Sequence, residues 1–332
     1  MATLKDVAKL AHVDVSTVSR ALNNSAYVHP DTKARIMKAV KELSYEPNIL
    51  ARGLRQGKRE TLGVILPKLS YSIFAEVASG IESQARKHGY VTLVSNTGND
   101  KDTEKLVLNR LRSGFIDALI IAGTGENTRL IRSISEEGMP VVQVIRDSDP
   151  LISSVVVDYD DVGYRSVQLL AKKGCRHIGL INGSMKIRPY AERYRGYRRG
   201  IREFGLPEIT AERESLQRGI QYGYDCALQL IDENCELDGI LAVTDTQAIG
   251  AMRALHDNDL SVPGQVRLLS MTGHQIGGML TPSLTSMELP AFEIGERATD
   301  MALQMIEAGS DKKPAVQRLS FHAELVERES TQ

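Results

Sequence analysis

The chain has 332 residues, of which 42% are hydrophobic and 25% are charged, and it contains no Trp. Because domains commonly hold about 100–200 residues, the chain is long enough for two or three soluble globular domains. No apolar run approaches the roughly 18–20 residues that a membrane helix needs, which excludes a membrane-spanning protein.

The first nine residues, MATLKDVAK, carry charges at short intervals. A secretory signal would need an apolar stretch of about 7–15 residues there, so we expect the protein to stay in the cytoplasm. The three cysteines, Cys175, Cys226 and Cys235, have spacings that match neither a thiol redox pair nor a zinc site. We therefore expect free, buried thiols.

The net charge is −1, from 41 basic and 42 acidic residues, and this average taken alone argues against a nucleic-acid partner. The charges are, however, unevenly distributed. Residues 1–59 hold 11 Lys and Arg against 5 Asp and Glu, a net charge of +6, and the remainder of the chain carries −7. A basic head ahead of an acidic body is typical of a protein of which one end meets a polyanion.

Three short helices are predicted in the basic head. Thr3 and Asp6 form a capping-box pattern at the start of the first helix, over residues 3–11. The second helix spans 15–23, and the third begins near Pro30, a residue favoured in the first turn. Their apolar stripes are Val7, Leu10 and Ala11, then Val15, Val18 and Leu22, then Ile36, Val40 and Leu43. Three such helices can bury one small shared core.

The second helix presents a polar face formed by Ser16, Thr17, Arg20 and Asn23. A tight turn followed by a helix with such a face is the geometry that places a recognition helix in the DNA major groove. There Arg20 could bond a guanine edge, Asn23 an adenine edge or a phosphate, and the two hydroxyls either bases or phosphates. The periodicity by itself fits a small solvated helical bundle equally well, but the basic excess and the terminal position favour DNA.

Four motifs carry a resemblance to a known family. They are TLKDVAKLA at 3–11, VSTVSRALN at 15–23, LSYEPN at 43–48 and ARGL at 51–54. In this order and spacing they resemble the headpiece of the LacI/GalR family of bacterial transcriptional repressors. The resemblance implies a DNA-binding set of Thr3, Val15, Ser16, Thr17, Ser19, Arg20, Asn23, Tyr27 and Leu54. In it, Val15 and Ser16 hold positions that vary with the operator sequence, and Tyr27 lies where the family touches the DNA backbone.

Residues 47–59 combine helix-forming residues with two glycines and four basic side chains, and the segment is too short to form a stable helix in isolation. In the family this linker folds into a hinge helix on DNA, and the two hinges of a dimer each insert a leucine into the minor groove. The matching residue is Leu54. Without the headpiece resemblance, Leu54 would be read as an ordinary apolar linker residue.

From residue 61 onward, short β-rich runs alternate with amphipathic helical stretches such as 102–112 and 191–204, the pattern of parallel sheets. The predicted strands are 61–67, 90–96, 116–123, 140–145, 154–158, 177–183, 239–244 and 266–272. This pattern predicts two doubly wound α/β subdomains with a ligand site in the cleft between them, outside the carboxyl ends of the strands. The predicted domains are a headpiece at 1–46, a hinge helix and linker at 47–59, and a bilobed effector-binding and dimerisation core at 60–332.

The core also resembles the family, whose core is like the bilobed periplasmic sugar-binding proteins. LPKLSYSIFAE at 66–76 matches a segment that holds pocket residues, ERYRGY at 192–197 matches the stretch whose arginine bonds the effector, and VTDTQAIG at 243–250 matches another contact segment. The candidates are Tyr71, Phe74, Arg193, Thr244 and Asp245, together with Arg146 at the end of a predicted strand.

One segment departs from the family pattern. Members commonly show Gly-Phe-Asp-Asp before a Thr-Pro, but this chain has SMTGHQIGGMLTP at 270–282, without a carboxylate. His274 and Gln275 would then supply the polar contacts, and Arg218 falls near the place of an aromatic ring in other members. Fewer acids and more arginines suit an anionic effector, such as a sugar acid or a sugar phosphate. A neutral sugar stays open, and Arg218 can equally be a surface charge.

The sequence shows no nucleophile elbow, no metal-ligand spacing and only a weak Gly123-Thr-Gly125 phosphate signal, so we expect no catalytic residues, no metal and no cofactor. The favoured function is a ligand-responsive repressor of carbohydrate uptake or catabolism genes. It would be a cytoplasmic, nucleoid-associated homodimer on pseudo-palindromic operator DNA, with no membrane partner, and the absence of a heptad tail favours a dimer over a tetramer. The alternative is a sugar-metabolising enzyme with an N-terminal helical appendage.

Overall fold

The computed structural model describes residues 2–23, 27–45, 59–211, 219–309 and 315–332. They belong to two compact units, Met1–Arg59 and Glu60–Gln332, and each unit has its own hydrophobic core. No helix within these ranges is both long and apolar enough to cross a lipid bilayer.

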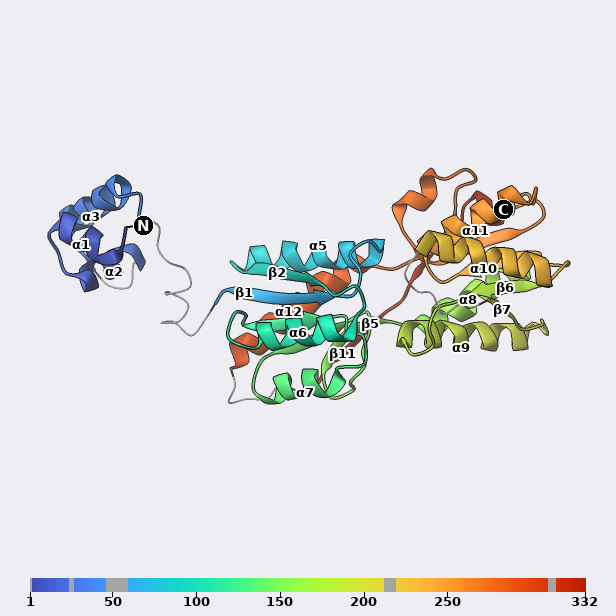
Figure 1. The fold of residues 1–332 in the computed structure, drawn as a ribbon, viewed down its shortest axis with the longest axis horizontal. Coiled ribbons are helices and arrows are strands. Elements are labelled where there is room, and N and C mark those ends of the chain that lie inside the picture. Colours follow the sequence, from blue (N-terminus) through green and yellow to red (C-terminus); the bar gives the residue numbers. More distant parts are fainter. Residues whose placement is uncertain (1, 24–26, 46–58, 212–218, 310–314) are drawn as a thin grey trace. The chain divides into compact units, whose positions relative to one another are not determined.

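The described residues of the first unit form a bundle of three helices, α1 (Leu4–Ala11), α2 (Val15–Asn23) and α3 (Pro30–Glu42) (Figure 1). These bounds confirm the predicted helices. The capping box of α1 is also confirmed: the Asp6 N–H donates to Thr3 Oγ1 at 3.3 Å, and the Thr3 N–H donates to the Asp6 carboxylate at 2.8 Å.

The core between these helices differs from the predicted apolar stripes at two positions. Leu10 is 40% exposed and Val15 is 37% exposed, whereas the small side chains of Ala8 and Ala21 are buried. Small residues at a helix contact bring the helix axes close together, which leaves the larger neighbours at its edge. The buried core consists of Val7, Ala8, Ala11, Val18, Ala21, Ile36 and Ala39.

The second unit has two lobes, each built on a six-stranded sheet (Figure 1). The first sheet is parallel throughout, in the order β11-β5-β4-β3-β1-β2. In the second sheet, with the order β12-β10-β9-β8-β6-β7, only the β10–β12 pair is antiparallel. The strands are β1 (Thr61–Leu66), β2 (Val91–Asn96), β3 (Ala118–Ile121), β4 (Val141–Val144), β5 (Ser153–Val157), β6 (Ile178–Ile181), β7 (Ile209–Ala211), β8 (Gly239–Ala242), β9 (Arg267–Gly273), β10 (Thr285–Glu288), β11 (Arg318–Phe321) and β12 (Glu324–Val326).

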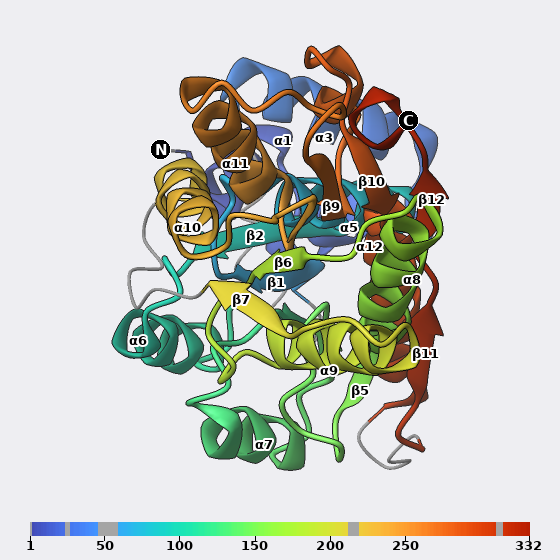
Figure 2. The ribbon, with the colours of Figure 1, turned by 90° about the vertical axis from the view of Figure 1, so that its right-hand side faces the viewer.

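Helices pack in pairs against these sheets. The first lobe has α5 (Ser72–Lys87), α6 (Lys101–Leu111), α7 (Thr128–Glu136) and α12 (Ala291–Ala308), and the second has α8 (Tyr159–Lys172), α9 (Arg188–Glu203), α10 (Gly219–Glu233) and α11 (Asp245–Asp257). Two 3-10 helices, η1 (Gln275–Met279) and η2 (Glu329–Thr331), follow β9 and β12. Viewed from the second lobe in Figure 2, α8 and α9 lie on one side of its sheet and α10 and α11 on the other. The predicted doubly wound architecture is confirmed.

All eight predicted strands are present, but β7, β10, β11 and β12 were not predicted. Three of them are very short or exposed. The fourth, β10, is buried and polar: the Thr285 hydroxyl lies 2.7 Å from that of Thr331 and donates to the Arg328 carbonyl at 3.0 Å. Partners from the end of the chain make this burial possible, and no local hydrophobic pattern reports such long-range hydrogen bonds.

The three cysteines are free. Cys175 and Cys226 are buried as predicted, but the prediction was wrong for Cys235, which is exposed. Cys235 lies in the connection between α10 and β8, where connecting segments run over the surface.

Three chain segments join the two lobes. The chain passes from β5 to α8, returns from β10 to α12, and passes again from β11 to β12 (Figure 1). The last segment is short, since Phe321 ends β11 and Glu324 begins β12. The lobes are therefore tied together along one side, and the opposed strand ends face the space between them.

Each of the three main helix pairs crosses at a glycine on both helices. A Cβ added to Gly196 of α9 would lie 2.0 Å from the Asp160 carbonyl oxygen, and one on Gly163 of α8 would lie 2.2 Å from the Arg193 carbonyl oxygen. The α10–α11 contact uses Gly223 and Gly250, and the α5–α12 contact uses Gly80 and Gly295, in the same way. Backbone meets backbone at these crossings, so the helices pack more closely than side chains would allow.

We expect Gly196→Ala to lower the free energy of unfolding of the core by about 1–3 kcal/mol, because the new methyl group can be accommodated only by moving a helix. Urea denaturation measures this change. The matched control is Gly278→Ala, where the nearest atom to an added Cβ is the Arg328 side chain at 3.6 Å. Equal stability of the two variants would contradict the close-packing explanation.

Candidate functional site

A cavity lies between the two lobes, at the carboxyl ends of the strands. It encloses about 480 Å³, its solvent-open mouth included. The first lobe supplies residues that follow β1 and β4, and the second lobe supplies residues at the starts of α8, α9 and α11 and within β9. Its polar wall contains Ser72, Arg146, Arg193, Thr244, Asp245 and Thr272.

Arg193 reaches the cavity from the second turn of α9 and is only 3% exposed. It donates to Thr272 Oγ1 at 2.6 Å, and its guanidinium carbon lies 4.3 Å from the centre of the Tyr159 ring. Its buried Nε has no hydrogen-bond partner among the described residues. Burial lowers the pKa of this guanidinium, because desolvation disfavours the charged form.

Arg146 reaches the cavity from the opposite lobe, directly after β4. The residue before it, Ile145, has a φ of 62°, and the Arg146 N–H donates to the Val144 carbonyl at 2.5 Å. A positive φ at a β-branched residue is strained, and this tight turn directs the next side chain away from the strand. Arg146 donates to Asn99 Oδ1 at 2.6 Å and lies over the Phe74 ring at 5.5 Å. Burial lowers the pKa of Arg146 as well.

Aromatic rings form much of the remaining wall, from Tyr71, Phe74, Tyr159 and Tyr190. Burial raises the pKa of Tyr71 and of Tyr159 to about 12, so both hydroxyls stay neutral in physiological conditions. The Tyr159 hydroxyl is buried and has no hydrogen-bond partner within the described part of the chain. It is therefore a hydrogen-bonding group that a bound molecule could satisfy.

Hydrogen bonds and ion pairs link the two lobes around this cavity. The Ser72 hydroxyl of α5 donates to the Asp245 carboxylate of α11 at 2.7 Å. Farther out, Glu76 of α5 lies 3.0 Å from His274 Nε2. These contacts connect the first lobe to the segments after β8 and β9, so the cavity is shaped by the relative position of the lobes.

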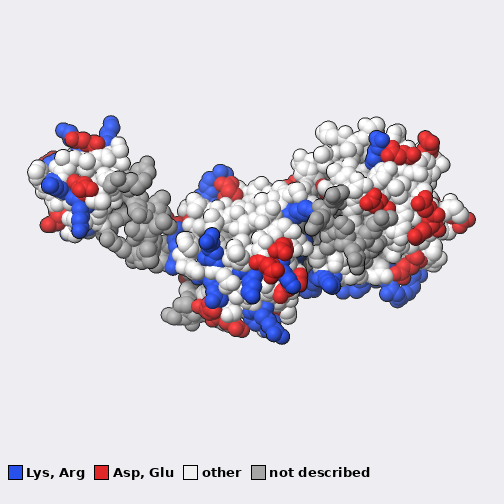
Figure 3. Space-filling view, in the orientation of Figure 1, with Lys and Arg blue, Asp and Glu red and all other residues white. Residues whose placement is uncertain are grey.

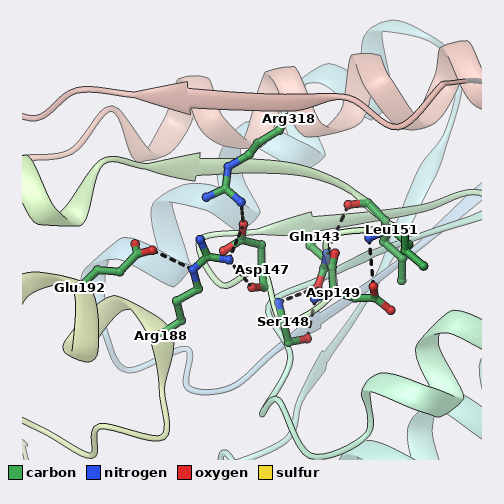
Figure 4. Close-up of polar contacts among 9 residues, drawn as sticks. Gln143, Asp147, Ser148, Asp149, Leu151, Arg188, Glu192 and Arg318 are labelled. Carbon is green, nitrogen blue, oxygen red and sulfur yellow. Dashed lines mark hydrogen bonds and ion pairs between the residues drawn. The ribbon is translucent and has the colours of Figure 1, made fainter.

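A second inter-lobe contact is centred on Asp147 (Figure 4). The Asp147 carboxylate is 6% exposed and pairs with Arg188 of the second lobe at 3.2 Å and with Arg318 of β11. The net effect of burial is to raise the pKa of Asp147, although the two guanidiniums oppose it. Next to it, Gln143 holds the loop by bonding the N–H groups of Ser148 and Asp149 at 2.8 and 3.1 Å. Of the described contacts that Asp147 makes, those with Arg188 span the lobes and that with Arg318 lies within the first lobe.

A second cavity, of about 670 Å³ with its solvent-open mouth included, adjoins the first and shares Arg146 and Ile187 with it. Its other walls include the Gly123–Gly125 turn, which was the weak phosphate signal in the sequence, and two further basic residues, Lys186 and Arg188. The space between the lobes therefore has two compartments, which meet at Arg146.

Six of the predicted effector residues lie in the cavity wall, namely Tyr71, Phe74, Arg146, Arg193, Thr244 and Asp245. His274 and Gln275 lie outside this wall: His274 accepts a hydrogen bond from the Ile276 N–H as the N-cap of η1 and faces Glu76 instead. Arg218 lies outside the described residues. Whether these side chains bind an effector stays a prediction.

Ser72, which follows the predicted Tyr71, was missed, and so were three further polar wall residues. Tyr159 and Thr272 lie at or just beyond the ends of β5 and β9, where the rule for parallel sheets places ligand contacts. Tyr190 lies three residues before Arg193 and therefore on the same face of α9. The strand-end rule and helical spacing could have identified all three residues.

The three-helix unit offers a second candidate site. On α2, Val15, Ser16, Arg20 and Asn23 are exposed, whereas Thr17 and Ser19 are partly buried. Along this helix Arg20 donates to the Ser16 carbonyl at 3.3 Å, and Asn23 to the Ser19 carbonyl at 2.9 Å. The face is hydrogen-bonded and free of large hydrophobic residues other than Val15, as suits contact with base edges.

The other predicted DNA contacts are distributed around this face. Thr3 is exposed at the start of α1, and Tyr27 is 83% exposed. Leu54 lies outside the described residues. Figure 3 shows basic and acidic side chains interspersed on the visible surface of this unit.

Comparison with known proteins covers both units. Residues 3–48 match the family of bacterial regulatory proteins named for LacI, and residues 59–323 match the periplasmic binding proteins and sugar binding domain of the same family. The chain is 31% identical to the HTH-type transcriptional regulator RegA of Clostridium saccharobutylicum, over all of both chains. It is 29% identical to the ribose operon repressor of Halalkalibacterium halodurans, over 100% of this chain and 97% of that protein.

The fold has close counterparts among solved structures. A Lac repressor dimer, bound to its operator and the anti-inducer ONPF, superposes with a TM-score of 0.87 at 23% identity, over 99% of both chains. At this identity the likeness concerns the fold. It confirms the predicted combination of a helix-turn-helix headpiece with a periplasmic-binding-protein-like core.

We expect Asp147→Asn to lower the free energy of unfolding by about 1–3 kcal/mol, because a buried charged partner of two guanidiniums is lost. It should also increase the radius of gyration of the core in solution scattering, since the Arg188 contact between the lobes is weakened. Arg318→Ala is the matched control, because it removes a partner within the first lobe only. An equal change in the radius of gyration for both variants would contradict the inter-lobe role of Asp147.

Proposed function

Because the chain belongs to the LacI family of bacterial regulatory proteins, we propose that it represses genes of carbohydrate uptake or catabolism and that a sugar or sugar derivative controls it. Like its relatives of known role, it is a DNA-binding transcriptional regulator and not an enzyme. The alternative of a sugar-metabolising enzyme is thus not supported.

The observation that carries the proposal is the pairing of two sites on separate units. The three-helix unit presents the α2 face with Ser16, Arg20 and Asn23, which suits base and phosphate contacts. The bilobed unit holds a cavity whose walls come from both lobes. A molecule that enters this cavity contacts both lobes at once, and its affinity must depend on their relative position.

Control of DNA binding follows from this dependence. An effector that binds one arrangement of the lobes better than another shifts the population toward it by its differential affinity. In a homodimer such a shift would change the spacing of the two hinge segments, residues 47–59, and so the fit of the headpieces to a pseudo-palindromic operator. The insertion of Leu54 into the minor groove is part of this proposal.

Charge supports the same assignment. Residues 1–59 carry a net charge of +6, so a dimer would present +12 at its DNA-reading end. Neutralisation of phosphates releases counterions, and operator affinity should therefore fall steeply with salt. We place the protein in the cytoplasm, associated with the nucleoid.

Arg20→Ala should weaken operator binding by roughly 1–3 kcal/mol, because a bidentate base contact is lost, and should leave effector affinity unchanged. Fluorescence anisotropy with labelled operator and calorimetry with the effector measure the two quantities. Arg35→Ala, which removes an exposed positive charge from α3, is the control and should have the smaller effect. Loss of both activities in Arg20→Ala would contradict the separation of sites.

Arg193→Ala should abolish the response to the effector while operator binding is retained, because Arg193 lies in the cavity wall of the core and not in the three-helix unit. Titration of the effector into the protein–operator complex measures the response. A variant that still responds with wild-type affinity would exclude Arg193 from the effector site.

A further inference from the structure

Two guanidinium groups in the cavity have no carboxylate partner among the described residues. Arg146 bonds only neutral oxygen atoms, Asn99 Oδ1 at 2.6 Å and the Gly123 carbonyl at 3.4 Å. Arg193 bonds only the Thr272 hydroxyl, and its buried Nε bonds no atom of the described chain. Neither guanidinium forms an ion pair with the carboxylates described here, although burial destabilises both charges.

Several other arginines of the core bond carboxylates, although the buried Nε of Arg267 also has no partner in the described chain. Arg132 bonds the buried Asp149 at 2.7 and 3.0 Å, and Arg328 bonds Glu288 at 2.6 Å. On the outer face of α9, Arg195 and Arg199 both bond Asp160. The same helix therefore carries arginines matched to carboxylates on its outer face and, on the opposite face, an arginine without a carboxylate that lines the cavity.

The carboxylate in the cavity wall does not balance these charges. Asp245 accepts hydrogen bonds from the Ser72 hydroxyl at 2.7 Å and from the Thr246 N–H at 2.7 Å. Both bonds hold it in the contact between α5 and α11. Among the charged side chains that line this cavity, two are guanidiniums and one is a carboxylate, so the lining carries a net positive charge. Glu104 and Glu192 act on these two arginines from outside the lining.

The charge increases toward the adjoining compartment. Arg146 lies in the walls of both cavities, and the second adds Lys186 and Arg188. The carboxylate in that wall, Asp147, is shared by Arg188 and Arg318, and Arg188 also pairs with Glu192 at 2.7 Å. The positive charge that remains in this wall is therefore that of Arg146 and Lys186. An anionic group that enters between the lobes is therefore most stabilised near Arg146.

We propose that the effector is a polyhydroxylated anion, a sugar acid or a sugar phosphate, whose carboxylate or phosphate oxygens accept hydrogen bonds from Arg146. This inference rests on the proposed function and narrows its ligand to one chemical class. Guanidinium binds both anions in bidentate fashion, so the two sources share one recognition chemistry.

The other walls suit the hydroxyl-bearing part of such a molecule. The Tyr159 hydroxyl and Arg193 Nε are buried hydrogen-bonding groups that are unsatisfied in the described chain, and Thr272 and Asp245 add acceptors. Phe74 and Pro189 supply apolar surface for the C–H face of a ring.

The test uses the full-length protein and matched sets of ligands on common hexose and pentose skeletons. Each set contains the neutral sugar, its aldonate and its phosphate, and inorganic phosphate is added as the bare anion. Thermal shift identifies ligands, and calorimetry gives Kd. We expect the tightest ligand to be an anion bound at least 10-fold more tightly than its neutral counterpart. Comparison of the Kd of the aldonate with that of the phosphate then shows which class of anion the site prefers.

Substitution of Arg146 supplies the second arm. Arg146→Gln should weaken the best anion roughly 10- to 100-fold, as expected for loss of a charge-assisted bond, and change the Kd of its neutral counterpart less than 3-fold. Arg146→Lys, which keeps the charge, should recover part of the affinity. Arg202→Gln removes an exposed charge from α9 outside the cavity and is the control.

The outcomes separate the two proposals. If no anion stabilises the protein more than its neutral counterpart, or if Arg146→Gln affects both equally, the anionic effector is excluded. A neutral sugar that binds the core and alters operator affinity would overturn this inference and leave the proposed function intact. Operator binding that no ligand of any class alters would count against the proposed function itself.

Discussion

Three chain segments tie the two lobes of the core together along one side, and the functional geometry depends on this constraint. Because β5, β10 and β11 all end at the boundary between the lobes, the lobes can change their relative position only about these segments. The carboxyl ends of the parallel strands face each other across the cavity. A ligand bound there therefore influences the relative position of the two lobes. Through that position a small molecule could affect the DNA contacts that the other unit makes.

The contact region between the two lobes contains buried charged side chains. There the structure keeps Asp147 paired with Arg188 and Arg318, but it leaves Arg146 and Arg193 without carboxylates among the described residues. An uncompensated guanidinium in a partly dry cavity is costly to maintain. A ligand that supplies the missing charge would recover that cost upon binding, so the same side chains that reduce the stability of the empty core would provide affinity and selectivity.

Local patterns in the sequence predicted most of the architecture. Apolar spacing and capping residues located all three headpiece helices, and β-rich runs located the eight apolar strands. The buried strand β10 was missed because Thr285 is satisfied by Thr331 and Arg328 from the end of the chain. Small-residue contacts, as at Ala8 and Gly196, were also missed, since their effect depends on which helices meet.

The candidate site was predicted in part, from motifs that resemble the family and not from apolar patterns. The motifs that resemble the family located Tyr71, Arg193 and Asp245, which lie just before α5, in the second turn of α9 and at the start of α11. They also suggested His274, but the backbone after β9 turns this side chain toward Glu76 and leaves Thr272 in the wall. The path of a loop depends on packing between lobes, which sequence spacing does not report.

Thermodynamic coupling between the cavity and the DNA-reading unit is the central claim, and it can be measured directly. Calorimetric titration of the effector into the free protein and into the operator-saturated protein gives two dissociation constants. We expect the two constants to differ by the same factor by which the effector changes operator affinity, because linkage between two sites is reciprocal. Identical effector affinity with and without operator DNA would contradict the claim.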